Sequence, residues 1–367
     1  MEALLVHEWL TNLAGSEKVV GALRRALPGA PVYTSMFWAP EFPGWDDVRT
    51  SFLQPLARGP SSHVPALPAM PAAFASLRLP PAELMITSFH SFSLWARPRP
   101  GTPHLVYCHT PPRFIWSSDQ LRGESGLMGG RVLRSAGAAF RRLDRGRARR
   151  PTMFVANSAA VAQRIQRAYG RPAEVVHPPV ELDRFTAAAS SAQAGARAGD
   201  YFLVVSRLVP YKQVDLAVDA FGELGLPLWV VGTGRSAGEL AARAGPNVRF
   251  LGRVSDEALP GLMAGARAMI MPGEEDFGLT VVEAMAAGTP VIALGRGGAA
   301  ETVTDGVTGV LFAEETVASL SQAVGRAAAI DWDRPAISAS TQRFGEARFR
   351  AAILALAADL AGGAVGP

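Results

Sequence analysis

The sequence predicts an α/β protein with two doubly wound domains, each built on a parallel sheet that helices cover on both faces. Its 367 residues exceed one typical domain and match two domains of about 170 residues each. In both halves, short apolar runs of strand length alternate with segments of helical pattern. A polar stretch of small residues at 186–200 separates the halves, and a buried-strand pattern, YFLVVS, begins directly after it.

These patterns set the expected domain boundaries. The first domain spans 1–180, the linker 181–200 and the second domain 201–340, and residues 341–367 follow as a C-terminal helical segment. Sheets of this class bind ligands at the carboxyl ends of their strands. Two such domains therefore predict one site in a central cleft that both domains face.

The composition excludes several classes of protein. Hydrophobic residues make up 49% of the chain, which is enough for a sizeable core. Cys108 is the single cysteine, so it excludes an intramolecular disulfide and favours a reducing, cytoplasmic compartment. The N-terminal MEALLVHEWL has no basic leader and predicts a first buried strand, not a signal peptide. No apolar run approaches the roughly 18 residues of a membrane span.

Residues 140–150, FRRLDRGRARR, form the densest positive run of the chain. Its arginines would attract phospholipid head groups or a diphosphate-linked acceptor, which favours peripheral contact with a membrane. The alternative is a solvated helix face, as in most charge runs. Aromatic residues for base stacking are scarce around it, so we expect no nucleic-acid partner.

The most informative stretch is 273–288, GEEDFGLTVVEAMAAG. An apolar run predicts a helix over 279–287, and Gly288 suits its left-handed cap. Glu275 would then lie in the loop before the helix and Glu283 in its second turn. The amides of Phe277, Gly278 and Leu279 would point into the same space, where a helix N-terminus favours anionic or hydroxyl-rich ligands. The alternative is an ordinary buried helix with acidic residues at its start.

The longer segment EEDFGLTVVEAMAAGTPVIALGRGGAAETVTDGVTGVLF closely resembles the donor-binding segment of retaining GT-B glycosyltransferases of family four. The resemblance implies two Rossmann-like domains that face a central cleft. It also implies that the last helix, within 341–367, crosses back to the first domain. Carried over, the first glutamate of the family, which binds donor-sugar hydroxyls, is Glu275. The second, which binds the nucleotide ribose, is Glu283.

Three further turns of the second domain fit this resemblance. Arg207 and Lys212 follow the first strand at the family's spacing of an arginine and a lysine that neutralise the leaving diphosphate. Gly232 and Gly234 follow the next strand and would bring the backbone close to the nucleotide. Main-chain atoms near Val254 would read the base. The alternatives are solvated charges and glycines of an ordinary tight turn.

The first domain retains a shorter set of family features. Of the usual glycine pair near the donor phosphates, only Gly15 is present, because Ala14 replaces the other glycine. His109 ends a predicted strand in LVYCHTPPRFIW, and similar His-Thr-Pro-Pro-Arg segments occur in a bacterial polysaccharide mannosyltransferase branch. The resemblance implies that His109 faces the donor sugar. His90, Arg113 and Trp116 are candidate acceptor contacts, with packing as the alternative for each.

The resemblance implies a hexosyltransferase that moves mannose from GDP-mannose to a saccharide or a lipid-linked saccharide in the synthesis of bacterial surface polysaccharide or glycolipid. No carboxylate pair resembles the Asp-x-Asp of metal-dependent transferases, so we expect no metal and no further cofactor, with Arg207 and Lys212 supplying positive charge. The resemblance also implies front-face substitution with retention, with His109, Glu275, Arg207 and Lys212 as the expected catalytic set.

Two other functions remain open. One is a catalytically silent GT-B subunit that binds sugar nucleotides, and the other is a transferase that uses a UDP-sugar or another donor. A dinucleotide-dependent oxidoreductase is disfavoured, because no GxGxxG follows the first strand. We expect a cytoplasmic protein, with peripheral contact at the inner face of the membrane as an extension of that location.

Overall fold

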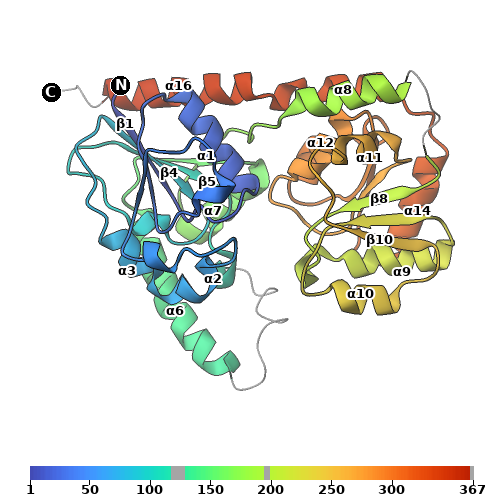
Figure 1. Cartoon of the computed structure of the whole chain (residues 1–367), viewed down its shortest axis with the longest axis horizontal. Helices are drawn as coiled ribbons and strands as arrows, with labels where there is room; N and C mark the ends of the chain where they lie inside the picture. Colours follow the sequence, from blue (N-terminus) through green and yellow to red (C-terminus); the bar gives the residue numbers. More distant parts are fainter. Residues whose placement is uncertain (117–128, 194–198, 364–367) are drawn as a thin grey trace. The chain divides into compact units, whose positions relative to one another are not determined.

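The structure, a computed structural model, describes residues 1–116, 129–193 and 199–363. The chain divides into two compact units (Figure 1). Unit 1 comprises Met1–Pro179 together with Glu346–Pro367, and unit 2 comprises Val180–Gly345. Each unit has a parallel sheet and its own core, which confirms the predicted fold class of two doubly wound domains.

The described part of unit 1 contains a seven-stranded parallel sheet in the order β3-β2-β1-β4-β5-β6-β7. Its strands are β1 Ala3–His7, β2 Val32–Thr34, β3 Val48–Thr50, β4 Leu84–Phe89, β5 His104–Cys108, β6 Met153–Ala156 and β7 Glu174–Val175. The central strands β1, β4 and β5 are buried along their whole length. A parallel sheet covered on both faces produces such continuous apolar strands, and β1 confirms the predicted first strand.

Helices flank this sheet in the described residues. They are α1 Gly15–Ala26, α2 His63–Ala66, α3 Met70–Ala75, α4 Arg113–Trp116, α6 Gly129–Ala148, α7 Ala159–Tyr169 and α16 Glu346–Gly363, with short 3-10 turns η1 Ala39–Glu41, η2 Gln54–Leu56, η3 Leu67–Ala69 and η4 Ser93–Trp95. The Ser158 side chain accepts a hydrogen bond from the amide of Val161 at 3.1 Å and caps α7. The C-terminal α16 packs beside α1 (Figure 1) and buries Phe349, Ile353 and Ala357 in the core of unit 1.

The described part of unit 2 contains a six-stranded parallel sheet in the order β10-β9-β8-β11-β12-β13. Its strands are β8 Phe202–Val205, β9 Leu228–Val231, β10 Val248–Gly252, β11 Met269–Met271, β12 Val291–Leu294 and β13 Gly309–Phe312. Its helices are α8 Leu182–Gln193, α9 Val214–Leu224, α10 Ala237–Arg243, α11 Leu259–Gly265, α12 Leu279–Ala286, α13 Ala299–Thr302, α14 Val317–Ala328 and α15 Arg334–Ser340, with 3-10 turns η5 Pro210–Lys212 and η6 Thr341–Phe344. Leu203 of β8 joins one core, whereas its neighbours Phe202 and Val204 join the other, so both faces of the sheet are covered.

The stretch 181–200, which we expected to be a linker, holds helix α8 instead. Leu182 and Phe185 are buried, and the helix packs against α11 and α12 of unit 2. Alanine favours a helix more than any other residue. The small residues of this stretch therefore continue a helix that its two large apolar residues anchor.

Both sheets reverse their strand order beside their first strand. The reversal lies between β1 and β4 in unit 1 and between β8 and β11 in unit 2. At such a point the connections leave the sheet in opposite directions, and the carboxyl ends of the two strands border a crevice where ligands bind in this class of fold. We therefore expect functional residues in the loops that follow these four strands.

Candidate functional site

In unit 2, a largely buried ion pair lies at the point where the strand order reverses. Lys212, at the end of η5 after β8, binds the carboxylate of Glu275, in the loop after β11. The side chains are only 13% and 15% exposed, which strengthens their attraction relative to a surface pair. The structure therefore brings together two of the predicted catalytic residues.

The loop of Glu275 is held by the glycine-rich loop after β12. The amide of Gly298 donates to the carbonyl of Glu275 at 2.9 Å, and Glu275 also pairs with Gly297 in a parallel bridge. A Cβ on Gly298 would lie 2.2 Å from the carbonyl oxygen of Phe277, closer than any side chain permits. These glycines therefore allow two loops to touch and fix the position of Glu275.

Arg207 is exposed just after β8, and its guanidinium donates to the hydroxyl of Tyr211. The Tyr211 ring centroid lies 6.0 Å from Cζ of Arg207 and 5.2 Å from Nζ of Lys212. One aromatic ring thus lies beside both predicted diphosphate-binding cations. The sequence analysis missed Tyr211, although an aromatic residue directly before Lys212 was the available signal.

Gly232 and Gly234 pack against the loop that carries Arg207. A Cβ on Gly232 would lie 1.9 Å from the carbonyl oxygen of Ser206, and one on Gly234 would lie 2.2 Å from that of Leu208. Close contact between these two loops is the role that the structure gives to the glycines. Val254, the predicted base-reading position, is half-buried against the core of unit 2.

The predicted helix after Glu275 is confirmed as α12, and Gly288 has the left-handed conformation expected of its cap, with φ 74°. Gly278 precedes the helix with φ 85°, a conformation that favours glycine. Glu283 lies in the second turn and is 8% exposed. Phe277 is buried, and its ring centroid lies 5.5 Å from that of Phe344, so its side chain belongs to the core of unit 2.

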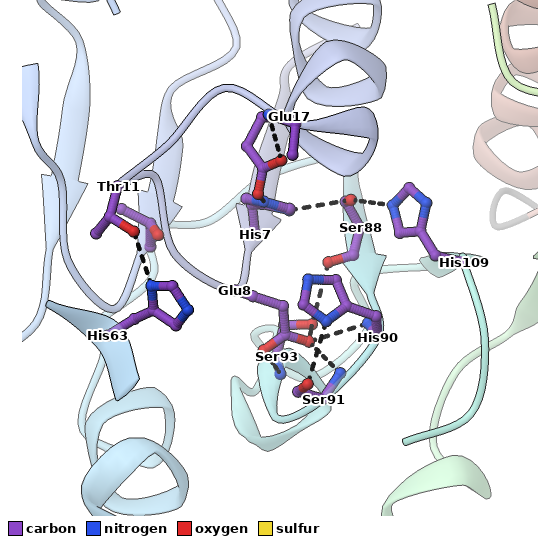
Figure 2. A network of polar contacts seen from close by, with 12 residues as sticks. His7, Glu8, Thr11, Glu17, His63, Ser88, His90, Ser91, Ser93 and His109 are labelled. Atoms are coloured by element: carbon purple, nitrogen blue, oxygen red, sulfur yellow. Dashed lines mark hydrogen bonds and ion pairs between the residues drawn. The ribbon is translucent and has the colours of Figure 1, made fainter. Parts of the chain in front are cut away.

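In unit 1, four polar residues form a chain across the strand-order reversal (Figure 2). Glu17 of α1 contacts Nε2 of His7, at the end of β1, at 3.3 Å. Nδ1 of His7 lies 3.0 Å from Oγ of Ser88 in β4, and the same Oγ lies 2.8 Å from Nε2 of His109, directly after β5. The structure thus places His109 at the carboxyl edge of the sheet, as predicted from the sequence pattern.

Two members of this chain have shifted pKa values. Burial, followed by the neighbouring His90 and His7, holds the pKa of His109 well below its usual value, so its ring is neutral near pH 7. Burial raises the pKa of Glu17, but its hydrogen bond and electrostatic interaction with His7 and the interaction with His90 outweigh this and lower the pKa. Glu17 is therefore a buried carboxylate.

Glu8, the residue after β1, is fully buried and organises the loop that contains His90 (Figure 2). Its carboxylate accepts hydrogen bonds from the backbone amides of residues 90–93, at 2.7 to 3.1 Å, and from the Ser93 hydroxyl at 2.8 Å. The His90 ring lies edge-on to those of His7 and His109, with centroids 6.1 Å away in each case. Sequence reasoning found His90 but missed Glu8, which holds it.

The remaining predicted residues of unit 1 have mainly structural surroundings. Gly15 begins α1, and the amide of Ala14 before it donates to Glu17 at 3.1 Å. Nε1 of Trp116 donates to Asp144 at 2.7 Å, which supports the packing alternative for this ring. Arg113 begins the short helix α4 and is half-buried.

The arginine-rich run 140–150 falls largely on α6. Three of its arginines contact the protein itself: Arg141 donates to the carbonyl of residue 115 at 3.1 Å, Arg145 donates to that of residue 168 at 2.9 Å, and Arg147 lies 4.0 Å from a tryptophan ring. About half of the positive run is thus committed to packing. No helix in the ranges that the structure describes is long and apolar enough to cross a bilayer.

Among the described residues, no group of three histidine, cysteine, aspartate or glutamate side chains is placed to hold a metal ion. The expectation that no carboxylate pair has the Asp-x-Asp spacing was wrong, because Asp331-Trp332-Asp333 lies before α15, where the Asp333 side chain accepts from the amide of Ala336 at 2.9 Å. Asp333 therefore caps a helix.

Comparison with known proteins matches both halves of the chain to glycosyltransferase families. Residues 13–184 match the family model described as Glycosyltransferase Family 4, and residues 199–329 match the one described as Glycosyl transferases group 1. A D-inositol 3-phosphate glycosyltransferase of Streptomyces avermitilis is 36% identical over 219 residues, which cover 52% of this chain and 46% of the relative. One of Salinispora arenicola is 38% identical over 168 residues, 38% of each chain. The chain thus spans about half the length, or less, of these curated relatives.

Solved structures resemble the whole chain. The Anabaena protein HepE in complex with UDP has a TM-score of 0.70 at 20% identity, covering 98% of this chain and all of its own. A sucrose-phosphate synthase of Thermosynechococcus elongatus has a TM-score of 0.72 at 18% identity, with the same coverage. At these identities the likeness shows the fold, which is GT-B.

Proposed function

We propose that this chain, which is built from two glycosyltransferase-family domains in a GT-B fold, is a retaining hexosyltransferase. In this proposal it moves mannose from GDP-mannose to a saccharide or lipid-linked saccharide acceptor. The observation that carries the proposal is the ion pair between Lys212 and Glu275 at the strand-order reversal of unit 2, with Arg207 beside it. A cation for a phosphate and a carboxylate for sugar hydroxyls are thereby fixed next to each other, as a nucleotide sugar requires.

We assign the donor contacts as follows. Glu275 accepts hydrogen bonds from hydroxyls of the transferred sugar, and Lys212 and Arg207 bind the diphosphate. Glu283 accepts from the ribose, and the start of α12 and the backbone near Val254 contact the nucleotide. Gly232 and Gly234 support Arg207 by packing on its loop, and Gly15 borders the donor phosphates.

The reaction balances without an added base or metal. An acceptor hydroxyl attacks the anomeric carbon on the face of the departing diphosphate, the bond from that carbon to the phosphate oxygen breaks, and the phosphate takes the hydroxyl proton. Lys212 and Arg207 stabilise the negative charge that grows on the diphosphate, as Mg²⁺ does elsewhere. His109 contacts the reacting sugar, and His90 and Arg113 are the proposed acceptor contacts.

The identity of the donor is the finer part of the proposal. GDP-mannose is supported by the segment from His109 to Arg113, whose His-Thr-Pro-Pro-Arg sequence resembles a bacterial mannosyltransferase branch. The second candidate is a UDP-sugar, because HepE, which shares the fold, was solved with UDP and with UDP-glucose. We place the reaction in the cytoplasm, with the exposed arginines of 140–150 in contact with the inner face of the membrane.

A panel of nucleotide sugars tests the donor. A ligand at about 100 times its Kd stabilises the folded protein by about 2.7 kcal/mol, so the preferred donor raises the Tm visibly. We expect GDP-mannose to do so, and we expect GDP release that requires an acceptor and continues in EDTA. Binding without release, across free and lipid-linked acceptors, would identify a silent GT-B subunit. Loss of activity in EDTA with recovery in Mg²⁺ would contradict the metal-free mechanism.

A further inference from the structure

A buried chain of hydrogen bonds connects Glu17, through His7 and Ser88, to one ring nitrogen of His109. Ser88, His7 and Glu17 are 1%, 0% and 2% exposed, so water cannot replace the partners that they give one another. Each link joins a different element, from α1 through β1 and β4 to the end of β5 (Figure 2). In such a closed chain, the donor at one link determines the donor at the next.

Glu17 determines which group donates at each hydrogen bond of the chain. One carboxylate oxygen accepts the amide of Ala14 at 3.1 Å, and the other faces Nε2 of His7. Because an ionised carboxylate only accepts, Nε2 of His7 must carry a proton. When the His7 ring carries this one proton only, its Nδ1 is an acceptor, so the hydroxyl of Ser88 donates to it.

Ser88 has one hydroxyl proton, and the hydrogen bond to His7 uses it. Its oxygen can only accept from Nε2 of His109, so that nitrogen carries the proton of the neutral His109 ring. Nδ1 of His109 is left with a lone pair, and within the described part of the chain it has no hydrogen-bond partner. The half-buried ring retains surface through which a ligand can reach this nitrogen.

We propose that Glu17, acting through His7 and Ser88, is a positioning residue that fixes the proton of His109 on Nε2, so that Nδ1 accepts a hydrogen bond from a sugar hydroxyl. The use of Nδ1 by the sugar rests on the proposed function, whereas the proton arrangement does not. Glu17, His7 and Ser88 therefore contribute to the site without touching the substrate.

Glu17→Gln is a nearly isosteric test, because the backbone dictates how the new amide must lie. The amide of Ala14 can only donate, so the carboxamide oxygen has to face it, and the carboxamide nitrogen then faces His7. The nitrogen donates to Nε2 of His7, and every later bond reverses. Ser88 then donates to Nε2 of His109, and the proton of His109 moves to Nδ1.

The experiment is ¹⁵N NMR of histidine-labelled protein at pH 8.5, well above the ordinary histidine pKa of about 6.5. The His109 signals are assigned by their loss in His109→Ala. We expect the Nε2–H tautomer in the unchanged protein and the Nδ1–H tautomer in Glu17→Gln. His104 is an internal control, because it lies at the other end of β5. Its Nε2 contacts Thr87 at 2.8 Å, and neither residue belongs to the polar chain from Glu17 to His109. The His104 signals should not change.

Ser88→Ala provides a second, independent arm by cutting the chain. In that background Glu17→Gln should leave the His109 tautomer unchanged. An unaltered His109 tautomer in the single Glu17→Gln variant, with the His104 signals native, would overturn the proposal, as would a reversal that persists without Ser88. A reversal of the tautomer with turnover unaffected would support the proton arrangement and count against the role of Nδ1 in the transfer.

Discussion

Both units have polar residues at the reversal of their strand order, but the burial of these residues differs between the units. At the β1/β4 reversal of unit 1, His7, Glu8 and Glu17 are almost fully buried and are satisfied by other protein groups. At the β8/β11 reversal of unit 2, Lys212 and Glu275 keep part of their surface exposed. Among the described residues of unit 2, Glu283 alone is an ionisable side chain in the buried class.

The difference shows that one topology can hold two kinds of polar cluster. Buried polar groups with fixed partners hold a geometry but offer few free donors or acceptors, which suits the support of a single side chain such as His109. Partly exposed charges can exchange a protein partner for a ligand, which suits the binding of a charged donor. We infer that unit 2 supplies the affinity for the nucleotide sugar and unit 1 the alignment of its sugar.

The largest expected effect comes from Glu275→Ala. Removing a polar group at the reacting sugar costs on the order of 100-fold or more in turnover, and the change also leaves Lys212 without its carboxylate partner. Glu274→Ala, on the same loop, is the matched control and should retain most activity. Steady-state nucleotide release checks both. Near-normal turnover in Glu275→Ala would remove this residue from the site.

Lys212→Ala comes next. A charge-assisted hydrogen bond contributes about 1.5 to 3 kcal/mol, which corresponds to roughly 10- to 150-fold. Because the leaving diphosphate gains charge in the transition state, turnover should fall by at least this range, and GDP affinity should fall less.

Arg207→Lys is the companion variant. We expect it to be impaired as well, since a point charge cannot reproduce a forked contact. If both variants raised only the apparent KM for the donor, these cations would be anchors for the ground state, and their role in the departure of the leaving group would be wrong.

The burial of charge in unit 1 predicts a dependence of stability on pH. Burial raises the pKa of Asp144 to about 6, although Trp116 and Tyr169 donate hydrogen bonds to it. Between pH 4 and 6 the folded state then binds more protons than the unfolded state, so the free energy of unfolding falls as the pH rises. Asp144→Asn removes this titrating group. From pH 4 to pH 8, the free energy of unfolding of the variant should therefore rise by about 1 to 3 kcal/mol relative to that of the unchanged protein.

Denaturant unfolding of both proteins at the two pH values checks this prediction, because the difference between them cancels every other titrating group. Asp219→Asn, at an ion pair on the surface of unit 2, is the comparison variant and should not show the gain. An Asp144→Asn curve parallel to that of the unchanged protein would show that the buried carboxyl is not protonated on acidification.

The smallest effect concerns the backbone beside Lys212. Gln213 has φ 51° and is the one residue other than glycine with a positive φ in the described chain. That conformation costs a residue with a Cβ about 1 to 2 kcal/mol, part of which glycine returns through its freer unfolded state. Gln213→Gly should therefore be more stable than Gln213→Ala by about 1 kcal/mol in denaturant unfolding. The reverse order would show that the left-handed backbone at this position does not disfavour a residue with a Cβ.

The sequence predicted most of the fold because fully buried parallel strands leave continuous apolar runs, as in β1 and β8. It also predicted α12 and the position of Glu275, since a glycine cap and an apolar helix are local features. It could not predict the pairing of Glu17 with His7, because that contact depends on how α1 lies over β1. Sequence alone shows only an acidic residue in a first helical turn.

Glu8 and Tyr211 were missed for a similar reason. The partners of Glu8 are more than 80 residues away, on a loop whose position is set by the pairing of β1 with β4. Tyr211 gains its place between two cations from the turn of η5. The helix α8 was missed because a stretch rich in small residues has the composition of a linker unless its anchoring residues are weighed.

We inferred that unit 2 binds the nucleotide and unit 1 aligns the sugar. The most direct test is the Kd of GDP, measured by calorimetry for the unchanged protein, Glu283→Ala and His109→Ala. Loss of the Glu283 carboxylate should weaken GDP binding by about 10-fold or more, the equivalent of one charge-assisted hydrogen bond. His109→Ala should bind GDP as the unchanged protein does while its turnover falls. Equal GDP affinity in all three proteins, or a loss confined to His109→Ala, would contradict the assignment of nucleotide binding to unit 2.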